Sequence, residues 1–359
     1  MKGKSLTVLL FAVALAPMCL AAEEKTTRYE VTDLGTLGGT ESFACGLNDR
    51  AEITGRSTIV AGPVHAFLWR DGTMTDLGTL PDDVSSVGRG INNAGQVVGG
   101  ATMSNTGPYD AVLWDDDEII PLGTLGGAHS LALAINQRGQ VTGAARTPTN
   151  ELHPFLWDEV GGMTDLGTLP GDTYTAGRGI NNQGQVVGQS SPTEAVAGSF
   201  GECGNKGASD GLARAVLWGN DGTITDLGTL GGKISIAKSI NARSVVVGSS
   251  TTAKGEQHAF LWRDGTMTDL GALGGTFSGA FEINRHDKVV GVASTVTGEF
   301  HAFLWTRGRM ADLNNLIPKR SGWILRRATG INKAGQITGW GSIGGQSHAF
   351  LLTPDHDDD

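Results

Sequence analysis

The sequence has few cysteines, no His-Glu-x-x-His or Cys-x-x-Cys motif, and no long apolar run beyond its first 22 residues. Three cysteines in 359 residues argue against a disulfide scaffold. The missing motifs remove the usual signatures of zinc and redox sites, and the Asp-x-Asn-x-Asp-Gly spacing of a calcium loop is also absent. We therefore expect no metal, no cofactor and no transmembrane segment. An enzyme is disfavoured but not excluded, because an active site assembled from several repeats leaves no local motif.

Basic residues are also scarce: 27 Lys and Arg stand against 37 Asp and Glu, for a net charge of −10. A nucleic-acid partner is not expected, because phosphate binding requires a basic face.

The first 22 residues have the organisation of a secretion signal. Lys2 and Lys4 precede an apolar stretch at 6–15, and small residues end the segment. The stretch is too short for a membrane anchor, and Cys19 lacks the small preceding residues of a lipoprotein signal. We expect a signal peptide at 1–22 and a secreted or periplasmic protein. Of the remaining cysteines, an oxidising compartment permits a Cys45–Cys203 disulfide, and the sequence leaves open whether it forms.

What the chain has in quantity is repetition. Seven copies of one pattern follow residue 29, each with an Ile-Asn turn, a short β-branched run, an aromatic run and an Asp-Leu-Gly run. The turn asparagines are Asn48, Asn92, Asn136, Asn181, Asn241, Asn284 and Asn332. The Asp-Leu-Gly aspartates are Asp33, Asp76, Asp165, Asp226, Asp269 and Asp312, with Pro121 in the degenerate copy. A period near 44 with short β-like segments predicts a stacked or closed repeat fold.

Each copy predicts four short antiparallel strands, which is one blade of a β-propeller. The third and fourth strands are joined by Asp-Gly at 71–72, 221–222 and 264–265, the dipeptide favoured in two-residue hairpin turns. Many of the 55 glycines recur at fixed positions, which indicates turns and close backbone approaches.

The chain opens with a lone fourth strand at 29–35 and ends with strands one to three of its last unit. Pairing the two ends would complete a blade and hide exposed strand edges. The sequence therefore predicts an all-β protein: a seven-bladed β-propeller of four-stranded antiparallel blades over 23–353, closed by the N-terminal strand and followed by an acidic tail at 354–359. An open β-solenoid is the alternative, but it would need capping units that are not apparent.

The copies resemble the HAF-repeat family of extracellular bacterial proteins, named for a triplet that occurs here at 65–67, 258–260, 301–303 and 348–350. The resemblance covers nearly the whole mature chain, with departures at 110–112, 153–155 and 214–216. It implies secretion and a β-rich repeat fold. It supplies no activity and no catalytic residues.

Residues that recur in every copy are interpreted as structural. The repeated His before Ala-Phe, as in His65, is expected to bond to backbone within its own blade, since third strands lie too far from the axis to share a metal ion. The repeated Asp is expected to accept backbone N–H groups and fix a turn.

Residues that break the repeat are better candidates for a site. Three positions before the turn asparagine, on the innermost strand, Arg89, Arg178 and Lys238 replace uncharged residues, and Glu282 breaks the pattern two positions before Asn284. We expect the three cations to face the axis and hold an anionic group, with Glu282 paired to one of them. The alternative is that they form salt bridges between blades, for instance with the repeated Asp.

Loop length also varies, and the variable connections emerge on one rim, where recognition usually resides. The longest, 191–212, is a partner arm or a tolerated insertion. We therefore expect a monomeric binding or scaffold module that uses the variable-loop rim for an unidentified protein or glycan partner. The alternative function is a carbohydrate- or ester-directed hydrolase or lyase with an axial site.

Overall fold

The computed structural model describes residues 27–60, 62–104, 108–193 and 212–355. Within these residues the chain forms 28 strands and one short 3₁₀ helix, η2 (Leu313–Asn315), and no α-helix. The described chain accordingly offers no helix of the length and apolarity needed to cross a membrane. The class expected from the repeat, all-β, is confirmed.

Four strands that follow one another in the chain pair as an antiparallel group, once per repeat. The first groups are β2–β5 (Gly38–Leu47, Ile53–Ile59, Val64–Arg70, Thr73–Asp76), β6–β9 (Ser85–Ile91, Val97–Thr102, Asp110–Asp115, Glu118–Pro121) and β10–β13 (Ser130–Ile135, Val141–Arg146, Leu152–Asp158, Gly162–Asp165). The next are β14–β17 (Tyr174–Ile180, Val186–Ser191, Arg214–Trp218, Ile224–Asp226), β18–β21 (Gly231–Ile240, Val246–Thr252, Gln257–Arg263, Thr266–Asp269) and β22–β25 (Gly274–Ile283, Val289–Thr295, Phe300–Thr306, Arg309–Asp312). The last strands are β26 (Ile324–Ile331), β27 (Ile337–Ile343) and β28 (Gln346–Pro354).

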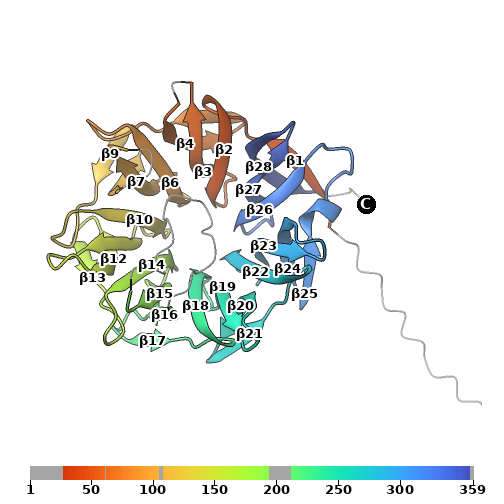
Figure 1. Ribbon diagram of the computed structural model, residues 1–359. Helices are drawn as coiled ribbons and strands as arrows, with labels where there is room; N and C mark the ends of the chain where they lie inside the picture. Colours follow the sequence, from red (N-terminus) through yellow and green to blue (C-terminus); the bar gives the residue numbers. More distant parts are fainter. Residues whose placement is uncertain (1–26, 61, 105–107, 194–211, 356–359) are drawn as a thin grey trace, which may run out of the picture.

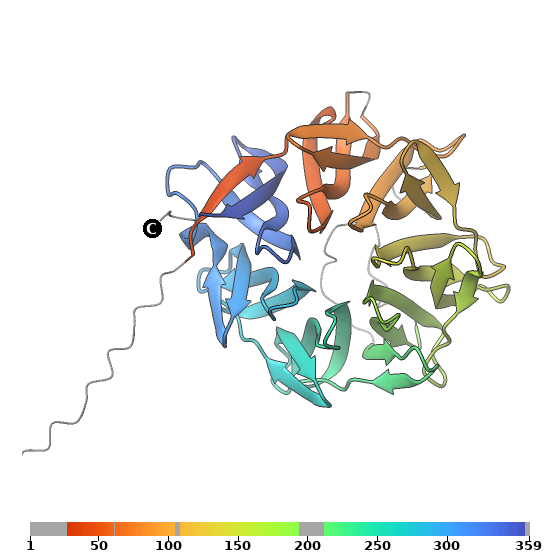
Figure 2. The ribbon, with the colours of Figure 1, turned by 180° about the vertical axis from the view of Figure 1, so that it is seen from behind.

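The groups lie side by side around a common axis, as in a β-propeller, with the first strand of each group innermost (Figures 1 and 2). Neighbouring groups are joined by single parallel bridges in two places, at Leu152 with Tyr174 and at Gln257 with Phe277. These bridges merge four groups into two eight-stranded sheets without changing the repeated unit.

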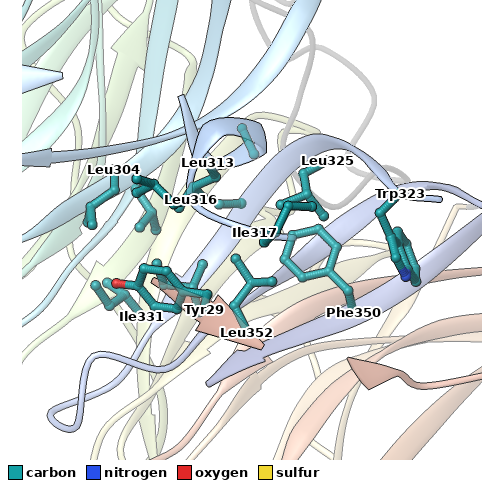
Figure 3. Packing of buried hydrophobic residues seen from close by; sticks show 14 residues of the cluster. Tyr29, Leu304, Leu313, Leu316, Ile317, Trp323, Leu325, Ile331, Phe350 and Leu352 are labelled. Carbon is teal, nitrogen blue, oxygen red and sulfur yellow. The ribbon is translucent and has the colours of Figure 1, made fainter. Parts of the chain in front are cut away.

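The first strand of the chain, β1 (Tyr29–Asp33), pairs with the last, β28, in the sheet order β1-β28-β27-β26. The expected pairing of the N-terminal strand with the three C-terminal strands is therefore present. Tyr29 is 2% exposed and packs with Leu352, Leu316 and Ile331 (Figure 3). Strand β28 extends through Pro354, one residue into the expected tail.

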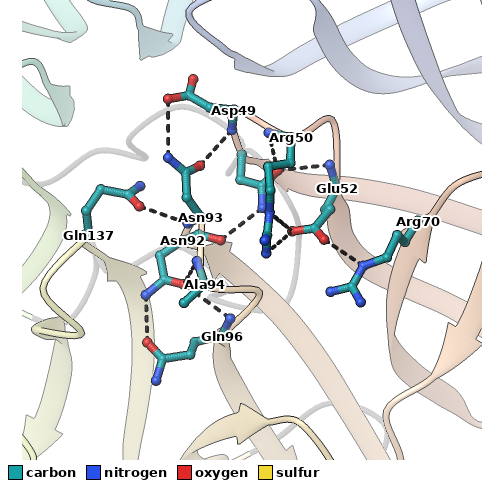
Figure 4. Close-up of polar contacts among 10 residues, drawn as sticks. Asp49, Arg50, Glu52, Arg70, Asn92, Asn93, Ala94, Gln96 and Gln137 are labelled. Carbon is teal, nitrogen blue, oxygen red and sulfur yellow. Dashed lines mark hydrogen bonds and ion pairs between the residues drawn. The ribbon is translucent and has the colours of Figure 1, made fainter.

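A closed circuit of hydrogen bonds links the turn asparagines at one end of the axis. Each buried asparagine donates from Nδ2 to the main-chain oxygen of its counterpart in the next group, and Asn332 donates to Asn48. The side-chain oxygen of each accepts two backbone N–H groups of its own turn, as Asn92 does from Ala94 and Gln96 (Figure 4). The sequence predicted a turn at each of these asparagines, but it did not predict the hydrogen bonds that join one turn to the next.

A glycine stands at the same position in the second strand of every group, and the reason is steric. At Gly188, a Cβ atom would lie 1.8 Å from the carbonyl oxygen of Ala176 on the inner strand, far inside van der Waals contact. The equivalent glycine of every other group is equally enclosed, with a carbonyl oxygen within 2.0 Å. The expected close backbone approach is confirmed at these positions.

The hairpins between third and fourth strands follow the expectation in part. Asp71 and Gly72, like Asp264 and Gly265, have positive φ at both residues, as a two-residue I′ turn requires. The prediction is wrong at 221–222, because the loop there runs from 219 to 223 and is closed by a bond from Gly219 N to Thr223 O.

Candidate functional site

The four residues that break the repeat line one cavity of about 270 Å³ at the axis. Arg89 lies on β6, Arg178 on β14, Lys238 on β18 and Glu282 on β22, and all four side chains are half-buried. Because the inner strands surround the axis, side chains that are far apart in the chain meet there. We call this cavity the axial chamber.

The chamber has a strong excess of positive charge among its described residues. Burial, and then the charges of Arg178, Arg327 and Arg89, hold the pKa of Lys238 well below its usual range. Burial and the charge of Arg89 lower the pKa of Arg178 to about 10. The guanidinium of Arg178 donates from Nε to the side-chain oxygen of Gln189, which lies 2% exposed on β15. A negative group entering the chamber would relieve this repulsion.

Glu282 is held by neutral hydrogen-bond donors, and not by one of the three cations as expected. Its carboxylate accepts a 2.5 Å hydrogen bond from Ser239 Oγ and a longer one from the Ile283 N–H. Burial raises the pKa of Glu282 to about 7, and these two bonds oppose the rise only in part. The expected ion pair with Arg89, Arg178 or Lys238 does not form within the described part of the chain, because the carboxylate is directed to Ser239 instead.

The alternative of salt bridges to the repeated Asp is also wrong, because those carboxylates are engaged within their own groups. Asp76 lies 2.8 Å from His65 Nδ1, and Asp226 lies 2.8 Å from Arg214. The same His–Asp pair recurs four more times, at His153–Asp165, His258–Asp269, His301–Asp312 and His348–Asp33.

These pairs revise one expectation and confirm another. The repeated His bonds to the Asp carboxylate of its own sheet, whereas the sequence had suggested backbone as its partner. The repeated Asp does accept a backbone N–H two residues on, as Asp269 does from Gly271 at 2.7 Å. Across the residues described, no three His, Cys, Asp or Glu side chains are placed to hold a metal ion.

Sequence reasoning missed Gln189, which accepts the bond from Arg178, and also Arg327 and Trp340, which line a separate pocket of about 420 Å³. Gln189 and Trp340 stand eight residues after their turn asparagines, where four other copies have Gly, Ala, Ser or Val. Arg327 lies with its guanidinium 5.3 Å from the Phe281 ring and 5.7 Å from the Trp340 ring. The same rule, a residue that breaks the repeat, would have found Gln189 and Trp340 had it been applied to the second strands.

Below the cations an aliphatic collar narrows the axis. Leu47, Ile91, Ile135, Ile180, Ile240 and Ile331 line both the axial chamber and a second hollow of about 250 Å³ beside the asparagine circuit. The charged chamber therefore faces the opposite rim, where the connections between second and third strands vary. Apolar side chains separate it from the amide-rich mouth.

Cys45 also lines the chamber and is disulfide-bonded. The other cysteines, Cys19 and Cys203, lie outside the described residues, as do the signal segment, most of the 191–212 connection and the last four residues of the tail. A Gly-x-Ser-x-Gly sequence at 207–211 falls outside them as well.

No protein-family model matches the chain, and no curated protein sequence matches it. Among solved structures, a puromycin-hydrolysing peptidase from Mycobacterium tuberculosis is similar with a TM-score of 0.52 at 10% identity, over 89% of this chain and 51% of that chain. A gluconolactonase from Xanthomonas campestris has a TM-score of 0.42 at 12% identity, over 96% and 99%. TolB from Acinetobacter baumannii has a TM-score of 0.44 at 9% identity, over 82% and 76%. These likenesses concern a propeller-like fold and no activity.

Proposed function

We propose that the protein is a closed seven-bladed β-propeller that acts as a secreted or periplasmic binding module, and that its axial chamber holds an anionic group of the ligand. The observation that carries the proposal is the convergence of Arg89, Arg178 and Lys238 on one cavity. Ring closure is supported by the asparagine circuit, which returns from Asn332 to Asn48.

Charge and position favour binding at this place. A ligand carboxylate or phosphate would meet guanidinium and ammonium donors in a partly desolvated setting, where charge-assisted hydrogen bonds are strongest. The chamber opens toward the variable connections, so those loops would contact the remainder of the ligand. The signal-like N-terminus and the HAF-like repeat support export.

Isothermal titration calorimetry with inorganic phosphate, citrate and D-glucuronate tests the proposal. Wild-type protein should bind at least one of these anions, and Lys238→Met should weaken that binding at least tenfold while removing a destabilising buried charge. Lys333→Met, at an exposed turn position at the asparagine-circuit end of the axis, is the matched control and should bind as the wild type does. Equal affinity in all three proteins would refute the axial site.

A second function, hydrolysis or elimination on an acidic saccharide or an ester, is favoured by one observation. Glu282 has a pKa of about 7 and shares the chamber with the cations, which is the state expected of a general acid or base. Glu282→Gln separates the two functions. A binding module keeps its anion affinity and shows no turnover with or without the substitution, whereas an enzyme loses turnover of its substrate in the variant.

A further inference from the structure

A pocket of about 420 Å³ lies between β24 and the β26–β27 pair, on the rim that carries the variable connections. Phe300 from β24 and Trp340 from β27 supply aromatic rings, and Ser342, Arg326 and Glu299 supply polar groups. The size falls within the range of small-molecule sites, and the mixture of aromatic and polar lining is typical of them.

The last copy has an added residue in its inner strand at this boundary. The register of β26 shifts between Leu325 and Arg327, so that Arg326 is the added residue and Leu325, paired with Gly341, holds the position of a Ser or Thr hydroxyl in the other copies: Ser42, Ser86, Ser130, Thr175, Ser235 and Ser278. In the first copy this hydroxyl joins neighbouring groups: Ser42 Oγ donates to Gly35 O at 2.6 Å and accepts from Ala349 N at 2.9 Å.

Another residue supplies that connection here. Asn314 accepts from Leu325 N at 2.7 Å and donates to Leu325 O at 3.0 Å. Arg326 is therefore not required for packing between the groups, and its place on the rim needs a different explanation.

The aromatic side of the pocket is fixed and open to solvent. Trp340 meets the Phe43 ring edge-on, with centroids 5.3 Å apart. Phe300 meets Phe277 edge-on at the same centroid distance and is 49% exposed. An exposed aromatic side chain held in place by a second ring loses little entropy when a ligand packs on it.

The polar side holds an ion pair, and the guanidinium of Arg327 also lines the pocket, 5.7 Å from the Trp340 ring. Arg326 Nη1 lies 2.6 Å from Glu299 Oε2, with the two side chains 28% and 59% exposed. The hydrogen bond and charge of Arg326 lower the pKa of Glu299. The Arg326–Glu299 pair presents planar donors and an acceptor side by side, with its own two charges balanced, which suits the hydroxyl groups of a ligand.

We propose that this pocket binds a neutral pyranose unit of a glycan, which would extend the proposed rim function to a saccharide ligand and rests on it. A pyranose has an apolar face of C–H groups and an edge of hydroxyls. The C–H face packs on Phe300 and the Trp340 edge of the pocket, while hydroxyls bond to Arg326, Glu299 and Ser342. An apolar peptide would leave these polar groups unsatisfied.

Saturation-transfer NMR with the methyl glycosides of glucose, galactose, mannose, N-acetylglucosamine and fucose tests this. At least one should bind wild-type protein, and both Phe300→Ala and Arg326→Ser should weaken it about tenfold. Arg326 is the added residue of β26 and its ion pair with Glu299 is part-exposed, so Arg326→Ser should fold. Val296→Ala, in the same connection and 82% exposed, is the control and should not change binding.

The outcomes distinguish this site from the axial chamber. Lys238→Met should weaken anion binding at least tenfold and leave glycoside binding intact. No binding by any glycoside in the millimolar range, or equal binding by Phe300→Ala, would overturn the saccharide site even if the axial anion site stands. Glycoside binding without anion binding would leave this site standing and remove the axial one.

Discussion

Asn332 donates a hydrogen bond from Nδ2 to the main-chain oxygen of Asn48, 3.2 Å away and 284 residues earlier in the chain. Both side chains are buried, at 4% and 3% exposure. Six equivalent bonds join the other turn asparagines, so this one completes a circuit around the axis. It links the last group to the first at the same end of the axis where every turn is capped by the same residue.

Asn332→Ala should therefore be strongly destabilising. The substitution removes one of the two bonds to the Asn48 carbonyl, which keeps the Ala51 N–H, and leaves two part-buried turn N–H groups without their acceptor. At about 1–3 kcal/mol for each unsatisfied N–H group, this predicts a loss of roughly 2–6 kcal/mol in the free energy of unfolding. Urea denaturation measures this. Asn220→Ala removes an exposed side chain with one long bond and should cost under about 0.5 kcal/mol, so equal losses would contradict a special role for the circuit.

The ring and the hydroxyl of Tyr29 should contribute differently to stability. Its ring packs in the core of the last group, but its hydroxyl has no hydrogen-bond partner among the residues that the structure describes, and burial raises its pKa to about 12. Tyr29→Phe should leave stability unchanged or raise it by about 1 kcal/mol, since an unsatisfied polar group disappears. Tyr29→Ala should cost about 3–5 kcal/mol through the cavity it leaves. Thermal unfolding compares them, and a destabilised Phe variant would show that the hydroxyl is bonded after all.

Gly188 should tolerate no side chain. Its Cβ would meet the Ala176 carbonyl oxygen at 1.8 Å, so Gly188→Ala should lose about 3 kcal/mol or more, or fail to fold. Gly279→Ala is the matched control, because its Cβ would meet only Ser249 Cβ at 3.8 Å. Denaturation midpoints of the two variants decide the matter, and similar midpoints would argue against the backbone approach.

Glu282 should make stability depend on pH. Its folded pKa of about 7 lies above the ordinary 4.5, so the folded state keeps a proton that the unfolded state has lost between these values. This stabilisation is complete below the unfolded pKa and is lost as pH rises through about 7, by up to about 3 kcal/mol. Glu282→Gln should lack that fall. Urea titrations at pH 5 and pH 8 test it, and parallel behaviour of the two proteins would contradict the raised pKa.

The fold class could be predicted because it depends on features within one copy. The Asp71–Gly72 hairpin, the second-strand glycines and the lone strand at Tyr29 each determine local geometry or leave an edge that must be paired. Contacts between strands and between copies were harder to predict, because they depend on which residues the strand register brings together. The asparagine circuit joins a side chain to a neighbouring turn, and His65 meets Asp76 only because two strands align their positions.

The part of the candidate site that lies on the inner strands could be predicted from the repeat period. The period placed Arg89, Arg178 and Lys238 at one height on three inner strands, and they do share a cavity. Nothing in the pattern revealed that Glu282 would turn to Ser239, because that bond depends on a substitution in the preceding copy. The rim pocket could not be predicted for a similar reason: Arg326 is recognised as an added residue only once the register of β26 with β27 is known.

The ionisation of Lys238 is the most direct test of the axial site. Its pKa is held low by burial and by Arg178, Arg327 and Arg89, so an anion bound in the chamber must raise it. Heteronuclear NMR of the Lys238 ammonium group, followed over pH with and without inorganic phosphate, citrate or D-glucuronate, measures that change. We predict a low pKa in the free protein that rises by at least one unit with a bound anion. An ordinary pKa in the free protein, or one that no anion moves, would contradict the account.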